Sequence, residues 1–199
     1  MHQCTFTGPS RTHASPWPLE APRVIDAASA FRCRGGDAAR HMPAEAADSG
    51  DFAFLHGRWL VENVRLAEPL ADRPRTITYD AVLDCRPLLG GSAHIEEMTS
   101  EDGAADAILR LHEPHNRRWS VHRVSSADGT LDRPLRGGFT EGLGVFVGEA
   151  VWRGITVLVR ETWRRDADGP HWEQSFSADG GETWRTHWVR RLIRVNWPD

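Results

Sequence analysis

The clearest structural signal in the chain is the run Gly144-Val145-Phe146-Val147-Gly148-Glu149-Ala150-Val151-Trp152, which continues through Arg153-Gly154 into Ile155-Thr156-Val157-Leu158-Val159. Small and bulky residues alternate in the first segment, and Ile155, Val157 and Val159 share one face of the second. A period of two is typical of a β-strand with one buried face, and a glycine between two such segments is typical of a turn. The run therefore predicts two neighbouring strands of an antiparallel sheet.

Similar segments, rich in Val, Ile, Thr and Trp and separated by Gly, Pro, Asp and Asn, extend on both sides of this run. We expect strands at 58–67, 75–86, 92–99, 105–113, 117–125, 134–141, 144–152, 154–164, 171–177 and 183–195. No amphipathic segment is long enough to connect parallel strands, which favours an antiparallel meander. Closure of the sheet would remove its exposed edges. We therefore predict an all-β fold, an up-and-down antiparallel barrel of about eight to ten strands, although the pattern alone also allows a sandwich.

The chain divides near residue 50 into a leader and a folded domain. Residues 1–50 are rich in Pro, Ala, Ser and Gly without any sustained hydrophobic period, and this composition predicts a disordered and dispensable leader. Met42 lies just before the domain and is an alternative start of translation. Residues 52–57 read as a short helical turn that ends at Gly57 and crosses one end of the barrel. The predicted barrel domain is 51–199.

Composition excludes several classes of protein. The 199 residues carry a formal net charge of −4, so no basic surface indicates binding to nucleic acid or to an anionic membrane. The three cysteines lack C-x-x-C spacing, which predicts neither a disulfide framework nor a zinc site. No apolar run approaches the length of about 18 residues needed for a membrane-spanning helix. We expect a soluble cytoplasmic protein without a bound metal, and a homodimer is a further expectation.

One recognisable motif occurs late in the chain. Ser177-Ala178-Asp179-Gly180-Gly181-Glu182-Thr183-Trp184 fits the Asp-box pattern S-x-D-x-G-x-T-W, which recurs in every blade of sialidase-type propellers. Here it occurs once, so it gives no support to a glycosidase. We expect the Asp carboxylate to bind turn amides and the Trp to pack under the hairpin.

Several segments together resemble a known group of proteins. Phe54-Leu55-His56-Gly57-Arg58-Trp59 is similar to the G-x-W opening of lipocalin-like (calycin) barrels, in which a Trp at the start of the first strand closes the barrel end. With Arg86-Pro87-Leu88-Leu89-Gly90-Gly91, the run from Trp172 to Gly181, and Trp184, the chain resembles uncharacterised bacterial calycin-like proteins over residues 51–195. The resemblance implies a calycin-like barrel and no particular reaction.

Polar and tryptophan side chains inside the predicted strands are the candidate site residues, because a polar group that faces a barrel lumen needs a partner. The candidates for ligand binding are His94, Glu96, His122, Arg160, Trp163, Glu173, His187 and Trp188. His94 and Glu96 are two apart and share a face. Arg160 and Glu173 lie on consecutive strands, where we expect a charged pair, with Arg160 anchoring an acidic group of the ligand.

Each candidate also has a purely structural interpretation. The polar side chains belong to a solvated outer face in that case, and Trp163, Trp172, Trp184 and Trp188 fill the core instead of lining a pocket. His112, Glu161 and Gln174 are further polar residues in strands. The sequence does not establish which strand phase faces inward.

Three functions fit these expectations. The first is a barrel that binds a small, largely apolar or aromatic molecule in its lumen, with Trp side chains stacking on it. The second is a cofactor-independent cyclase or isomerase of secondary metabolism, in which a His or Glu moves a proton. The third follows from the resemblance: some intracellular calycin barrels hold haem through one His, here His187 or His94. Apart from haem, no cofactor is expected.

Overall fold

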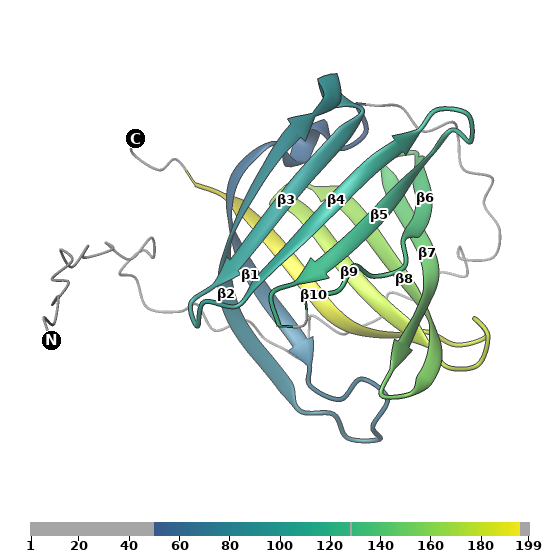
Figure 1. The fold of residues 1–199 in the computed structure, drawn as a ribbon. Coiled ribbons are helices and arrows are strands. Elements are labelled where there is room, and N and C mark those ends of the chain that lie inside the picture. The colour runs from purple at the N-terminus through teal and green to yellow at the C-terminus, as the bar shows by residue number, and fades with distance from the viewer. Residues whose placement is uncertain (1–49, 128, 196–199) are drawn as a thin grey trace, which may run out of the picture.

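The computed structural model describes residues 50–127 and 129–195, which form a ten-stranded closed barrel (Figure 1). The strands are β1 (Gly57–Leu66), β2 (Thr76–Leu88), β3 (Ala93–Ser100), β4 (Ala105–Glu113), β5 (Arg118–Ser125), β6 (Leu135–Thr140), β7 (Leu143–Trp152), β8 (Ile155–Asp166), β9 (Gly169–Ser177) and β10 (Arg185–Arg194). Each strand pairs antiparallel with its neighbours in the chain, and β1 pairs with β10. The all-β antiparallel barrel is therefore confirmed, and the sandwich alternative is wrong.

The hairpin of β7 and β8 shows how alternation determines the faces of the barrel. Phe146, Val157 and Val159 are buried in the lumen, whereas Val147 and Val151 are exposed on the outer surface. Burying the apolar face of each strand removes that area from water, and this burial is the main term that favours closure. Residues paired across neighbouring strands point to the same side of the sheet. The strand register therefore also determines which residues of the other strands face the lumen.

A close approach between β6 and β7 requires glycine. A Cβ atom on Gly137 would lie 1.8 Å from the backbone oxygen of Val145, a distance that no side chain tolerates. Gly137 also faces inward between Trp119 and Phe146, its partners in the register. The missing side chain leaves room for these two large rings inside the barrel.

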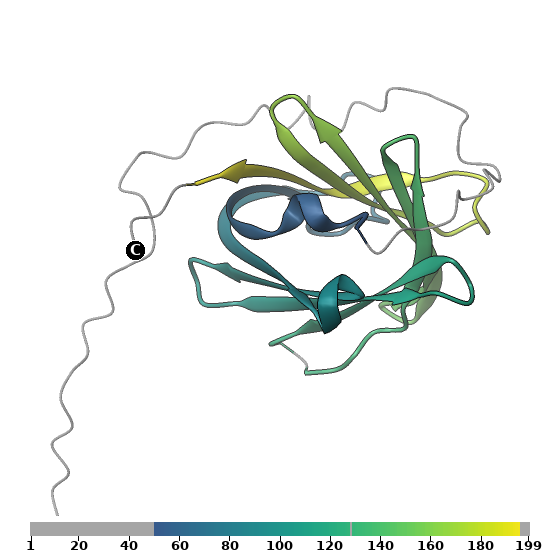
Figure 2. The ribbon, with the colours of Figure 1, turned by 90° about the horizontal axis from the view of Figure 1, so that it is seen from above.

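A single 3₁₀ turn, η1 (Ala53–Leu55), lies across one end of the barrel, as Figure 2 shows from above. Leu55 points inward and is fully buried, and its carbonyl accepts a 2.8 Å hydrogen bond from Nε1 of Trp59. The chain then enters β1 at Gly57, whose φ of 109° is readily adopted only by glycine. The predicted helical segment across the barrel end is thus present as one turn. We call this end the plugged end.

The Asp-box forms the turn between β9 and β10, as predicted. The Asp179 carboxylate accepts hydrogen bonds from the hydroxyl and the backbone N–H of Thr183 and from Oγ of Ser177, which hold its pKa below the usual range. Trp184 donates from Nε1 to the carbonyl of Gly181 and packs against the turn. The motif stabilises a hairpin.

The predicted disordered leader lies outside the described residues, and its dispensability stays a prediction. In the described ranges 50–127 and 129–195, no helix is long and apolar enough to cross a membrane. Cys85 of β2 is a free, buried thiol, and burial raises its pKa to about 12.

Candidate functional site

The plugged end of the lumen is filled by aromatic rings. Phe52, just before η1, is fully buried, and its ring centroid lies 5.1 Å from those of Trp119 and Phe139 and 5.5 Å from that of Phe146. His94 lies beside this cluster, with its Nδ1 atom 2.7 Å from Nε2 of His56. This end of the barrel is a packed core.

A buried ionic layer crosses the middle of the lumen. Glu96 lies between two fully buried arginines, 2.5 Å from Arg110 Nη2 and 3.3 Å from Arg190 Nη1. The Arg190 guanidinium lies 4.3 Å from the ring centroid of Trp172 and 4.2 Å from that of Trp188. Aromatic faces attract a desolvated cation, so the rings and the carboxylate together compensate the buried charge.

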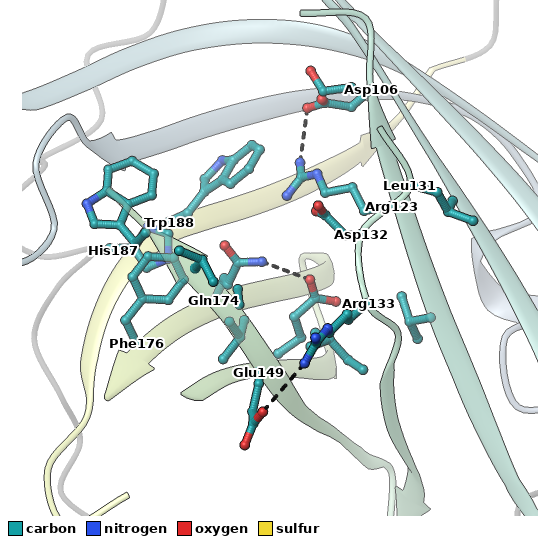
Figure 3. A pocket seen from close by; sticks show the side chains of 18 of the residues that line it. Asp106, Arg123, Leu131, Asp132, Arg133, Glu149, Gln174, Phe176, His187 and Trp188 are labelled. Atoms are coloured by element: carbon teal, nitrogen blue, oxygen red, sulfur yellow. Dashed lines mark hydrogen bonds and ion pairs between the residues drawn. The ribbon is translucent and has the colours of Figure 1, made fainter. Parts of the chain in front are cut away.

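Beyond this layer the lumen opens into a cavity of about 690 Å³ at the end opposite the plug (Figure 3). Strands β1, β4, β5, β6, β7, β8, β9 and β10 contribute its walls. Its lining residues include Arg65, Asp106, Val121, Arg123, Ala150, Trp152, Val159, Glu161, Gln174, Phe176, His187 and Trp188. At the mouth, Leu131, Asp132, Arg133 and Glu149 are exposed. Ligand sites in proteins occupy upwards of about 300 Å³, so this cavity is large enough to hold a small molecule.

His187 enters the cavity because β10 contains a bulge. The register with β9 shifts between Thr186 and Trp188, so His187 and Trp188 both turn inward although they are adjacent. The imidazole is 2% exposed and its ring centroid is 3.9 Å from that of Phe176. Neither ring nitrogen has a hydrogen-bond partner among the described residues.

The electrostatic environment keeps His187 neutral. Burial lowers its pKa to about 3, and the nearby Arg65 and Arg123 guanidiniums act in the same direction. A neutral imidazole with both nitrogens available can donate one hydrogen bond and accept another, or bind a metal centre.

A second buried polar group reaches the cavity from β8. Glu161 is 3% exposed and accepts a 2.9 Å hydrogen bond at Oε1 from Nε2 of Gln174, which lies opposite it on β9. Its other oxygen, Oε2, has no partner in the described part of the chain. An unsatisfied buried carboxylate oxygen is costly, so it needs water or a donor group of a ligand.

The eight candidates from the sequence fall into four places: the cavity, the ionic layer, the packed half of the lumen and the outer face. His187 and Trp188 line the cavity. Glu96 belongs to the ionic layer, and His94 and Trp163 belong to the packed half of the lumen, where Trp163 lies 6.4 Å from Phe52 between ring centroids. Of the two histidines considered for haem, His187 alone lines this cavity.

Arg160, Glu173 and His122 face outward, and the expected Arg160–Glu173 pair is wrong. Trp163 points inward on β8, so the even-numbered residues of that strand face solvent. Glu173 pairs with Arg164 and with His171, whereas the Arg160 guanidinium lies 4.4 Å from the ring centroid of Trp184. His122 contacts Ser120 Oγ at 3.2 Å on the outer face of β5.

Arg65 and Arg123 line the cavity but were not among the eight candidates. For Arg65 the sequence contains a usable signal: it lies six residues after Trp59, and Trp59, Val61 and Asn63 share its inward face. Arg123 shares the face of Trp119 and Val121 in the same way. A charged residue in phase with buried apolar neighbours therefore indicates a lumen position.

Comparisons with known proteins do not identify the chain: no protein-family model matches it, and a search of curated proteins finds no match. The structure itself shows a closed barrel with a buried aromatic cluster, an architecture compatible with binding a ligand. In the described ranges, no three His, Cys, Asp or Glu side chains are grouped to hold a metal ion.

We predict that His187 makes the fold sensitive to acid. Between about pH 6.5 and 3 the unfolded chain protonates this residue whereas the folded protein does not, so stability falls as the pH falls through that window. The loss is up to about 1.4 kcal/mol per pH unit. Urea unfolding between pH 7.5 and 4.5 measures the free energy of unfolding. This free energy should fall less steeply with falling pH for His187→Gln than for the wild type. The control His115→Gln changes an exposed turn residue, and equal slopes for all three proteins would contradict the prediction.

Proposed function

We propose that the protein binds a small, largely aromatic or apolar molecule in the cavity of the barrel. The observation that carries this proposal is a cavity of about 690 Å³ into which two buried groups project unsatisfied polar atoms. Among the described residues, both ring nitrogens of His187 and the Oε2 atom of Glu161 lack a hydrogen-bond partner. Buried polar atoms are nearly always hydrogen-bonded, so these atoms indicate that polar groups of a guest complete the site.

The remaining walls suit an aromatic guest. Trp188, Phe176 and Trp152 present rings to the cavity, and the last two are 5.8 Å apart between centroids. Ring stacking adds to the gain from burying apolar area. Membership of the calycin-like group, which the closed barrel and the Trp59 position support, is part of the same proposal. Cytoplasmic location and a homodimer stay predictions from the sequence.

The proposal predicts that filling the cavity abolishes binding. Ala150 faces the lumen on β7, so Ala150→Trp places an indole inside the cavity. We expect it to weaken binding of the neutral fluorescent probe N-phenyl-1-naphthylamine at least about tenfold, because the two rings compete for one space. Fluorescence titration measures the dissociation constants.

Val147→Trp is the matched control, because Val147 lies on the same strand and is 39% exposed on the outer face. It should retain wild-type affinity for the probe. Equal affinities of the Ala150→Trp and Val147→Trp proteins would place the probe outside the lumen and overturn the proposal.

Haem binding is the second candidate, and the neutral, unpartnered imidazole of His187 favours it. His187 would hold the iron, and the guanidiniums of Arg65 and Arg123 would bind the carboxylates of the haem. Haem supplies ligand binding or redox chemistry at its iron. Adding haem should then give a Soret band that His187→Ala removes and His94→Ala retains. No Soret band in the wild type would eliminate this candidate.

A further inference from the structure

Three guanidinium groups converge on one indole at the inner end of the cavity. The Cζ atoms of Arg65, Arg123 and Arg190 lie 4.5, 4.4 and 4.2 Å from the ring centroid of Trp188. The residues come from β1, β5 and β10, so the closed barrel alone brings them together. Positive charges gathered around one ring repel one another where neither water nor an anionic partner offsets them.

Two of these three arginines have a carboxylate partner. Arg190 is 3.3 Å from Glu96, and Arg123 is 3.0 Å from Asp106 (Figure 3). Arg65 contacts the Trp188 ring, and within residues 50–127 and 129–195 no carboxylate forms an ion pair with it. One cation of this group is therefore uncompensated.

The lowered pKa values of His187 and Arg190 indicate the same excess of positive charge. His187, 2% exposed and unpartnered, adjoins this cluster, and Arg65 and Arg123 both lower its pKa. The Arg123 guanidinium also lowers the pKa of Arg190, which burial brings to about 10. An anion placed here would relieve this repulsion.

The acidic side chains of the cavity lie elsewhere or are engaged. Asp132 lies next to Arg123, since its backbone N–H donates a 2.8 Å hydrogen bond to the Arg123 carbonyl, but it is exposed and water screens its charge. Glu149 is exposed at the mouth, 4.0 Å from Arg133. Asp106 is the partner of Arg123, and Glu161, hydrogen-bonded to the neutral Gln174, offsets part of the Arg190 charge. The group beside Trp188 is therefore the strongest attraction for a negative charge within the lumen.

We propose that the guest of the cavity is an aromatic anion, such as a carboxylate or sulfonate, whose charged group binds Arg65 and Arg123 while its rings lie against Trp188 and Phe176. This inference rests on the proposed function. Guanidinium groups are weakly hydrated and bind carboxylate and sulfonate oxygens through paired N–H donors. The unpartnered nitrogens of His187 supply one further hydrogen bond to the same group.

Two probes that differ by one charge test the proposal. 1-Anilinonaphthalene-8-sulfonate has the rings of N-phenyl-1-naphthylamine and adds a sulfonate. We expect the wild type to bind the sulfonate at least about tenfold more tightly than the neutral probe, because charge-assisted hydrogen bonds are added. Arg65→Gln and Arg123→Gln should each weaken sulfonate binding about tenfold and leave the affinity for the neutral probe unchanged.

Arg58→Gln is the matched control, since Arg58 lies on β1 with Arg65 but faces outward, 3.4 Å from Asp84. Its affinities should equal those of the wild type. Arg123→Gln leaves Asp106 without its partner and could prevent folding. Arg65→Gln then provides the test, because Arg65 has no ion pair among the described residues.

The outcomes separate the two proposals. Equal affinities for both probes, unchanged in Arg65→Gln, would overturn the anion site while lumen binding stands. Probe binding that Ala150→Trp does not weaken would overturn lumen binding itself. A preference for the sulfonate that Ala150→Trp and Arg65→Gln both abolish would support both proposals.

Discussion

Replacing Glu96 by glutamine is expected to lower the free energy of unfolding by about 3 to 5 kcal/mol, the largest effect of any single polar substitution in the barrel. The change keeps the size of the side chain but removes the charge that compensates two fully buried arginines, Arg110 and Arg190. Those guanidiniums would then face each other with aromatic rings as their main compensation. Urea denaturation at pH 7 measures the loss.

Glu173→Gln provides the control on the outer surface. Glu173 also contacts two basic residues, Arg164 and His171, but water reaches the group, so its removal should cost less than about 1 kcal/mol. If the Glu96 and Glu173 variants lose equally little stability, the central ionic layer does not hold the barrel together.

Phe52→Ala is expected to cost about 3 to 5 kcal/mol, because it leaves a void at the centre of the plugged end. The ring is fully buried among Trp119, Phe139 and Phe146, and the Arg110 guanidinium lies 4.8 Å from its centroid. The variant should also show a red shift of tryptophan emission when water reaches this cluster. Thermal and urea unfolding, followed by fluorescence, measure both effects.

Phe54→Ala is the matched control two residues later. Phe54 is only half-buried over the same cluster, so its truncation should cost clearly less than that of Phe52. A Phe52→Ala protein as stable as Phe54→Ala would show that η1 is a loosely attached cover and does not form part of the core.

The strands could be predicted because local alternation and turn residues determine them. The β7–β8 hairpin, for example, follows from Phe146, Val157 and Val159 alternating with exposed residues on either side of Gly154. The turn at Asp179 was likewise predictable, since its hydrogen bonds join residues within seven positions of one another. Such features depend on neighbours in the sequence alone.

The site was harder to predict because it depends on strand phase and on closure. The register of β8 and β9 places Trp163 and Trp172 opposite each other in the lumen, which sends Arg160 and Glu173 to the surface. Choosing the phase from the largest apolar residue of each strand would have avoided that error. The bulge at His187 breaks alternation, and no local sequence signal marks it.

The convergence of Arg65 and Arg123 on Trp188 is the feature that is hardest to predict from the sequence. It requires β1, β5 and β10 to meet around one lumen, and β5 is separated from the other two by most of the barrel in sequence order. Only the closure of β1 onto β10 and the diameter of the barrel determine these distances.

The central claim is that the guest occupies the lumen beside Trp188. The most direct test follows the indole N–H resonances of the nine tryptophans in ¹⁵N-labelled protein during titration with N-phenyl-1-naphthylamine, assigned with Trp→Phe variants. The resonances of Trp188 and Trp152, which line the cavity, should shift, whereas those of Trp59 at the plugged end and Trp184 on the outer face should not. Shifts confined to Trp184, with Trp188 and Trp152 unchanged, would contradict the account.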